Sequence, residues 1–203
     1  MRKEAGRPAL VLASASPRRL ALLARIGIEP ALVLAADIDE AGHLGERPAA
    51  LAARLAVEKL HVIAARAEVQ NLFPAPLILA ADTVVSVGRR VLPKAESAEE
   101  ARGCLSLLSG RRHAVTTGVA IARGAVFRSR IVETRLRFKR LSEVEIERYV
   151  ACGEWEGKAG GYGIQGRAEA FIPWISGSHS NVVGLPLAET ANLIESLCPG
   201  YFS

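Results

Sequence analysis

A short polar segment, residues 14–19, lies where the sequence pattern predicts that a buried strand passes into a helix. The apolar run at 9–13 predicts the strand, and Pro17 stands where the first helical turn would begin. The free amide groups of a helix N-terminus attract anions, and Arg18 and Arg19 add two positive charges there. The segment therefore predicts a phosphate site, with a surface helix start and solvated arginines as the alternative.

Asp82 follows directly on a second apolar run, residues 77–81, which predicts another buried strand. Open α/β sheets bind ligands at the carboxyl ends of their strands, and a buried carboxylate is costly unless it has a partner. We therefore expect Asp82 to hold a metal, accept a proton or pair with a base. The alternative is a turn or helix-capping aspartate.

Lys59 falls on the apolar face of a helix predicted at about residues 48–68, between Leu55 and Ile63 on the helical wheel. An ammonium group in that position must either reach an anion or extend its stem along the apolar surface until its charge meets water. The sequence leaves both outcomes open.

Gly161, Gly163 and Gly166 spell a G-x-G-x-x-G pattern, but the setting is wrong for a dinucleotide fingerprint. That fingerprint follows a strand and opens a helix, whereas here a helix precedes the loop and a strand is predicted after it, at about 169–175. We interpret these glycines as a loop that lets the backbone approach a ligand closely, with Lys158 and Gln165 as the polar groups available to meet it.

The cysteines and histidines predict no metal or redox site. The three cysteines lie far apart without a C-x-x-C pair, which is typical of reduced thiols in a cytosolic protein. None of the four histidines has the spacing of a metal ligand.

The elements that must position these groups alternate between strands and helices, which predicts a single α/β domain. Further strands are expected at about 31–36, 113–122 and 126–138, the last two as an antiparallel pair joined near Gly124. Two S-x-x-E capping boxes predict helix starts, and a last helix is expected at about 187–197. The boxes are Ser97 with Glu100 and Ser142 with Glu145.

The composition of the chain limits the classes of protein to which it can belong. The 203 residues are 50% hydrophobic and 23% charged, which suits one globular domain. No apolar run approaches the roughly 18 residues that cross a membrane. The net charge of +5 is spread along the chain and only 5% of residues are aromatic, so specific nucleic-acid binding is not expected. The apolar run at 9–13 is too short for a signal peptide, and residues 1–7 are expected to form a flexible tail.

Taken in order, these segments resemble the Maf family of nucleoside triphosphate pyrophosphatases. The resemblance covers nearly the whole chain, and its strength lies in the order of many short motifs. They are L-A-S-A-S-P-R-R at 12–19, D-I-D-E at 37–40, L-A-V-E-K at 55–59, A-D-T-V-V at 81–85, L-P-K at 92–94, L-S-G-R-R-H-A-V-T-T-G at 108–118, K-A-G-G-Y-G-I-Q-G at 158–166 and N-V-V-G-L-P-L at 181–187.

The resemblance implies an elongated mixed β-sheet flanked by helices, with two lobes around a central cleft as in inosine-triphosphatase-like proteins. It also implies a cytoplasmic homodimer that hydrolyses dTTP and UTP, and CTP or modified pyrimidine nucleotides as further candidates, to the monophosphate and pyrophosphate. A divalent metal, Mg²⁺ or Mn²⁺, would assist. The family usually has G-K-P where this chain has Pro93-Lys94-Ala95, and an acidic residue where it has Gly157.

The same resemblance assigns roles to nine residues. Asp82 becomes the proton acceptor and a metal ligand, and Glu40 a second metal carboxylate. Phosphates would be contacted by Ser14, Arg19, Lys59 and Lys94, and the base would be selected by Arg18, Thr83 and Gln165, which match the dTTP/UTP branch of the family.

Two other functions stay open on the sequence alone. The first is a non-catalytic role in cell-division or septum control, or in nucleic-acid binding, that uses the same cleft. The second is a pyrophosphatase for damaged purine triphosphates, which would favour an acceptor rather than an amide at residue 165.

Overall fold

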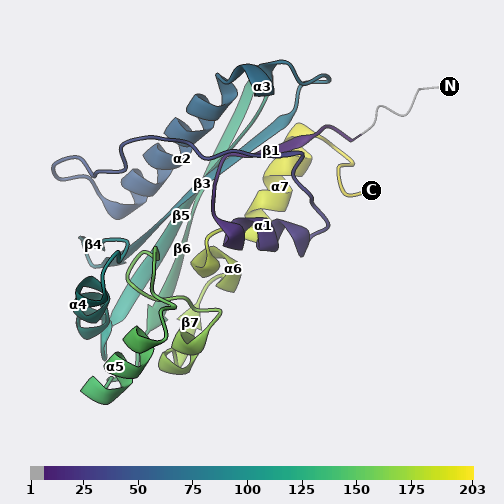
Figure 1. The fold of residues 1–203 in the computed structure, drawn as a ribbon. Coiled ribbons are helices and arrows are strands. Elements are labelled where there is room, and N and C mark those ends of the chain that lie inside the picture. The colour runs from purple at the N-terminus through teal and green to yellow at the C-terminus, as the bar shows by residue number, and fades with distance from the viewer. Residues whose placement is uncertain (1–6) are drawn as a thin grey trace.

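The computed structural model describes residues 7–203, which form one seven-stranded mixed sheet with helices on both faces (Figure 1). The strand order is β2-β1-β3-β5-β6-β7, and β4 pairs with β3 outside this path. β1 is parallel to β2 and β3, and the remaining pairs are antiparallel. The strands are β1 Leu10–Leu12, β2 Leu32–Val33, β3 Leu77–Val87, β4 Arg90–Leu92, β5 Arg112–Arg123, β6 Val126–Arg137 and β7 Trp174–Ser176.

The helices divide between the two faces of the sheet. Side chains alternate along β3, so Ile78 and Ala80 pack toward α2, whereas Leu77 and Leu79 pack toward α1 and α7. No helix among residues 7–203 is long and apolar enough to cross a membrane. The helices are α1 Pro17–Ala24, α2 Pro48–Ala64, α3 Ala67–Gln70, α4 Ala98–Leu108, α5 Glu143–Ala151, α6 His179–Val183 and α7 Leu187–Leu197, with a 3-10 helix at Arg167–Phe171.

The hydrophobic core is divided along the long strands, which gives the molecule two lobes (Figure 1). One lobe gathers α1, α2 and α7 around the first half of β3 and the second half of β5. The other packs α4, α5 and the 3-10 helix around the opposite ends of these strands, with Phe138 and Tyr149 fully buried at its centre. The elongated mixed sheet and the two-lobed α/β fold expected from the sequence are confirmed.

Several elements form as their sequence signals predict. Both capping boxes are present, with each serine hydroxyl accepting from the backbone amide of the glutamate three residues later. β5 and β6 pair as a hairpin around Gly124, and α7 spans the expected residues 187–197.

Other elements differ from expectation. β3 does not end before Asp82 but continues to Val87, because β5 pairs with it as far as Ser86. The predicted helix at 48–68 is two helices, α2 and the short α3. The strand expected at 169–175 is wrong over most of its length, because the 3-10 helix there buries Ala168 and Phe171 and only β7 is extended. The strand expected at 31–36 is reduced to Leu32–Val33.

The predicted tail at 1–7 lies almost wholly outside the described residues. Arg7 is described, and its Nε donates to the Tyr201 carbonyl oxygen at 2.6 Å.

Gly118 on β5 allows α2 to lie directly on the sheet. A Cβ at this position would lie 2.6 Å from the carbonyl carbon of Ala52 and 2.9 Å from Cα of Ala53, so the helix backbone would have to move. We expect Gly118→Ala to lower the free energy of unfolding by about 3 kcal/mol, at the upper end of overpacking effects. Urea denaturation measures this.

Gly103→Ala is the matched control, because Gly103 lies inside α4 and a Cβ added there would have no neighbour within 4 Å. We expect that variant to be unchanged or more stable by up to about 1 kcal/mol, since alanine favours helix. Equal stability of the two variants would contradict the close approach of α2.

Candidate active site

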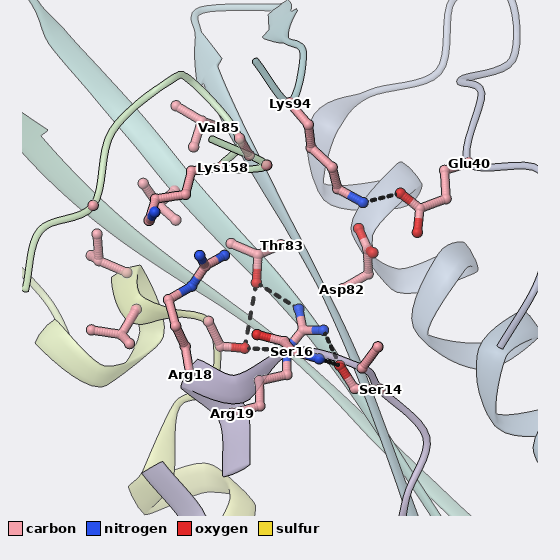
Figure 2. Close-up of a pocket in the computed structure, with 18 of the residues that line it drawn as sticks. Ser14, Ser16, Arg18, Arg19, Glu40, Asp82, Thr83, Val85, Lys94 and Lys158 are labelled. Carbon is pink, nitrogen blue, oxygen red and sulfur yellow. Dashed lines mark hydrogen bonds and ion pairs between the residues drawn. The ribbon is translucent and has the colours of Figure 1, made fainter. Parts of the chain in front are cut away.

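A pocket lies between the two lobes at a gap in the sheet beside β3 (Figure 2). On this edge β1 pairs with Leu77–Leu79 and β4 pairs with Val85–Val87, so within the described chain no strand covers residues 80–84. Asp82 and Thr83 point to opposite faces of β3, yet both line the pocket because it wraps around the uncovered edge. The gap in the sheet, rather than a strand end, gives the buried Asp82 access to the pocket.

On the α2 side of β3, two lysines alternate with two carboxylates. Nζ of Lys59 lies 2.5 Å from Oδ1 of Asp82 and 2.6 Å from Oε1 of Glu40. The second oxygen of Glu40 pairs with Lys94 (Figure 2). Lys59 is only 7% exposed and Asp82 only 4%. The open question about Lys59 is thereby answered: its stem lies among apolar residues and its charge reaches anions inside the protein.

Glu40 is held in its charged form by these lysines. Burial raises the pKa of Glu40, but hydrogen bonds from Lys59 and Lys94, together with their charges, outweigh burial and lower the pKa to about 2. The carboxylate is therefore ionised throughout the neutral range.

On the opposite side of β3, Arg19 is fixed by three neutral acceptors. Its Nε donates to the Gly184 carbonyl at 2.8 Å, and its two terminal nitrogens donate to Ser14 Oγ at 3.0 Å and Thr83 Oγ1 at 3.2 Å. Burial lowers the pKa of Arg19, but a guanidinium remains charged in proteins. Among the described residues no carboxylate lies within 4 Å of Arg19, so its charge is free to attract an anion.

The start of α1 has the local structure that its sequence predicts. Pro17 occupies the first turn, and the buried Ser14 hydroxyl accepts from the Ser16 amide at 3.2 Å. The Ser16 side chain makes no capping bond to the helix. The first amides of α1 therefore keep their ability to bind an anion, as a phosphate site requires.

The glycine-rich loop closes the pocket from the second lobe, and part of its composition serves packing. Gly160 and Gly161 have φ values of +71° and +66°, and a Cβ on either would lie 2.9 Å from Val85 Cγ1 or 3.2 Å from Cys104 Cβ. Of the three glycines expected to allow a ligand to approach, Gly163 lines the pocket. Gly161 makes room for α4 and Gly166 for the Glu154 side chain. Lys158 and Gln165 do line the pocket, as expected.

The loop also positions Lys94 and Lys158 on the pocket wall. The amide of Ala95 donates to the Lys158 carbonyl at 3.2 Å, and the amide of Gly157 donates back to Ala95 at 3.0 Å. Burial, and then the nearby Arg18 charge, lower the pKa of Lys158. Lys94 and Lys158 therefore both line the pocket. They lie in the two segments where this chain differs from the usual family motifs, Pro93-Lys94-Ala95 and Gly157.

All nine residues assigned roles from the sequence line this one pocket, although they come from both lobes and from segments far apart in the chain. They are Ser14, Arg18, Arg19, Glu40, Lys59, Asp82, Thr83, Lys94 and Gln165. Two buried polar residues behind the pocket, Thr117 and Asn181, were not assigned a role from the sequence. The only sequence signal for them was their place within two of the matching motifs.

Comparison with known proteins identifies the family. The family model described as "Maf-like protein" matches residues 9–197. This chain belongs to the Maf family.

Curated relatives of this Maf-family protein are similar over nearly their whole length. A protein of Novosphingobium aromaticivorans is 59% identical over 190 residues, which cover 93% of this chain and 92% of the relative. A protein of Caulobacter vibrioides is 57% identical over 191 residues, covering 94% and 96%. Both relatives are named dTTP/UTP pyrophosphatase.

Solved structures show a more distant likeness. A HAM1 protein from Coxiella burnetii has a TM-score of 0.44 and 16% identity, over 66% of this chain and 74% of that one. The Ham1 protein of Staphylococcus aureus has a TM-score of 0.41 and 16% identity, over 64% and 71%.

Glu40 and Asp82 are the carboxylates in the pocket lining that could hold a hard divalent cation. Among residues 7–203 there is no group of three or more histidine, cysteine, aspartate or glutamate side chains arranged around a metal. Asp82 and Glu40 do face the same pocket and are joined by one ammonium group. One or two carboxylates completed by phosphate oxygens and water is the set that Mg²⁺ prefers.

Proposed function

We propose that this Maf-family protein is a nucleoside triphosphate pyrophosphatase that hydrolyses dTTP and UTP to the monophosphate and pyrophosphate. One observation carries the proposal: a buried carboxylate, Asp82, opens into a pocket whose walls hold five cationic side chains. These are Arg18, Arg19, Lys59, Lys94 and Lys158. The names of relatives that are 57–59% identical support the same activity and the same substrates.

The cations supply what a triphosphate requires. The phosphorus atoms are shielded by anionic oxygens, and the departing pyrophosphate carries further negative charge, so positive groups fixed in advance lower the barrier. Arg19 has N–H groups beyond the three that its neutral partners occupy, because a guanidinium carries five. We assign the phosphate contacts to Ser14, Arg19, Lys59 and Lys94.

Asp82 serves as the proton acceptor in the proposed reaction. Its Oδ1 accepts from Lys59, which holds the carboxylate in one orientation, and no bond from a described residue occupies its second oxygen. That oxygen is available to orient the attacking water and to take its proton as the bond to the α-phosphorus forms.

A divalent cation, Mg²⁺ or Mn²⁺, would be held by Asp82 and Glu40. When bound, it supplies Lewis-acid neutralisation of the phosphate oxygens. We further propose that the protein acts in the cytoplasm, without a nucleic-acid partner, and as a homodimer.

Gln165 is assigned to base selection together with Arg18 and Thr83. Uracil and thymine offer an N–H donor between two carbonyl acceptors, and an amide can meet a donor and a neighbouring acceptor at once. We expect Gln165→Glu to lower the ratio of kcat/KM for UTP to kcat/KM for GTP by a factor equivalent to about 1 to 3 kcal/mol of discrimination. A carboxylate repels the uracil carbonyls and suits the paired donors of guanine.

Steady-state kinetics with both nucleotides measures this change in preference. Gln70→Glu, which makes the same charge change at an exposed residue of α3, should keep the parent preference. An unchanged UTP-to-GTP ratio in Gln165→Glu would show that Gln165 does not contact the base.

A substrate panel tests the proposed function as a whole. Purified protein is incubated with Mg²⁺ or Mn²⁺ and UTP, dTTP, CTP, GTP or ATP in turn, and released pyrophosphate is measured. The proposal expects the highest rates with dTTP and UTP. Sequence-selective nucleic-acid binding at physiological salt without hydrolysis would instead support the non-catalytic alternative.

A further inference from the structure

A series of buried and half-buried hydrogen bonds runs behind the pocket and ends on the hydroxyl of Thr83. Arg19 donates to Thr83 Oγ1 at 3.2 Å, and the hydroxyls of Thr83 and Thr117 lie 2.9 Å apart. The Thr117 hydroxyl in turn lies 3.2 Å from the Asn181 carbonyl oxygen. Thr117 and Asn181 have no exposed surface, so these groups depend on one another for partners.

The number of hydroxyl protons and the O···O distances indicate which group donates in each of these hydrogen bonds. A carbonyl oxygen can only accept, so the bond to Asn181 uses the single proton of Thr117. Either hydroxyl of the Thr83–Thr117 pair can be the donor, and with the Thr117 proton on Asn181 it is Thr83 that donates to Thr117. The competing acceptor for that proton, the Gly184 carbonyl, is farther away at 3.4 Å. Arg19 occupies one lone pair of the Thr83 hydroxyl, so Thr83, which lines the pocket, keeps one lone pair and no free proton for a ligand.

Asn181, at the far end of this series of hydrogen bonds, is held in place by its side chain. The Asn181 side-chain nitrogen donates to the Val115 carbonyl at 3.1 Å and to Thr134 Oγ1 at 3.0 Å. These two bonds tie α6 to β5 and β6, so the carbonyl that orients Thr117 has a fixed position.

We propose that Thr117 is a positioning residue for base selection, because it commits the Thr83 proton and so presents Thr83 to the nucleotide as an acceptor. This inference rests on the proposed function, in which Thr83 contacts the base. An acceptor suits the N3–H donor of uracil and thymine, whereas N3 of cytosine is itself an acceptor. With uracil, Thr83 and the Gln165 amide oxygen share the N3–H donor, while the Gln165 amide nitrogen donates to a neighbouring carbonyl. The Gln165 amide can turn over to suit cytosine but the fixed hydroxyl cannot, so Thr83 is what separates uracil from cytosine.

Removing the Thr117 hydroxyl tests the proposal. Thr117→Val keeps the shape but frees the Thr83 proton, and Thr117→Ser keeps the hydroxyl. The affinities of the α,β-methylene analogues of UTP and CTP, which cannot be cleaved at the α–β bond, are measured by titration calorimetry with Mg²⁺. We expect Thr117→Val to reduce the preference for the UTP analogue about tenfold, the scale of one hydrogen bond, and Thr117→Ser to retain it within about twofold.

Thr116→Val is the matched control. Thr116 is the neighbouring buried threonine on β5, 2% exposed, and it faces the opposite side of the sheet. Its substitution should leave the UTP-to-CTP affinity ratio at the parent value.

The outcomes separate this inference from the function on which it rests. A parent-like ratio in Thr117→Val, or a parent protein without preference for the UTP analogue, overturns the inference. If Thr117→Val does not fold, Thr117→Ala decides, because it also frees the Thr83 proton and must show the same loss of preference. A failure to hydrolyse any triphosphate contradicts the proposed function instead, and the measured affinity ratios still decide the role of Thr117.

Discussion

Asp82→Asn is expected to lower kcat for dTTP and UTP hydrolysis by about 10² to 10⁴, the scale of removing one acid–base group. The amide keeps the size of the side chain, but it can neither take a proton nor contribute negative charge to a cation site. Lys59 retains Glu40 as a partner, so the fold should survive the change. Single-turnover kinetics measures the loss, and urea denaturation verifies that the variant is folded.

Asp37→Asn controls for a carboxylate-to-amide change near the pocket, because Asp37 is exposed on the segment that leads to Glu40. That variant should keep the parent rate. Activity of Asp82→Asn within threefold of the parent would remove Asp82 from the chemistry.

Lys59→Met is expected to weaken binding of the triphosphate by about 2 to 4 kcal/mol, or roughly 30- to 1,000-fold. Methionine fits the apolar face of α2 that the lysine stem occupies, so the stem is replaced and the charge alone is lost. Asp82 and Glu40 would then share the pocket without the ammonium that now joins them, and they would repel the incoming phosphates. Equilibrium binding of the α,β-methylene analogue of UTP measures this loss.

Two further lysine variants calibrate the result. Lys94 is about half exposed, and among residues 7–203 its one ion pair is with Glu40, so Lys94→Met should weaken binding by a smaller factor, since water screens its charge. Lys139→Met removes a surface ion pair with Glu145 and should leave nucleotide affinity unchanged. Unchanged affinity in both Lys59→Met and Lys94→Met would show that these lysines are structural.

Signals that act within one helical turn or one strand were sufficient for several parts of the fold. Pro17 and the capping-box serines Ser97 and Ser142 mark helix starts because their effect is local to the first turn. The helical wheel likewise placed Lys59 on the buried face of α2, because helix periodicity depends only on spacing.

Features that depend on distant segments could not be predicted in this way. The full length of β3 beyond Asp82 depends on β5, more than thirty residues later, which pairs with β3 as far as Ser86. The shared ion pairs of Glu40 bring together a loop, α2 and the segment after β4, and no sequence period links these. The 3-10 helix at Arg167–Phe171 packs Phe171 against Tyr149 and Phe138, and these contacts between distant segments are not visible in the apolar run that predicted a strand there.

The same distinction applies to the site. Resemblance to a family brought nine residues together as a set, but only the structure shows that they surround the uncovered edge of β3. The direction of the hydrogen bonds through Thr117 depends on which hydroxyl meets which carbonyl across three elements, so it has no counterpart in the sequence pattern.

The position of bond cleavage tests the central claim most directly. The protein is incubated with UTP and Mg²⁺ in ¹⁸O-labelled water, and the products are separated and analysed by mass spectrometry and ³¹P NMR. Attack of water at the α-phosphorus predicts UMP that carries the label, together with unlabelled pyrophosphate. UDP with orthophosphate, or label in the pyrophosphate rather than in UMP, would contradict the proposed reaction.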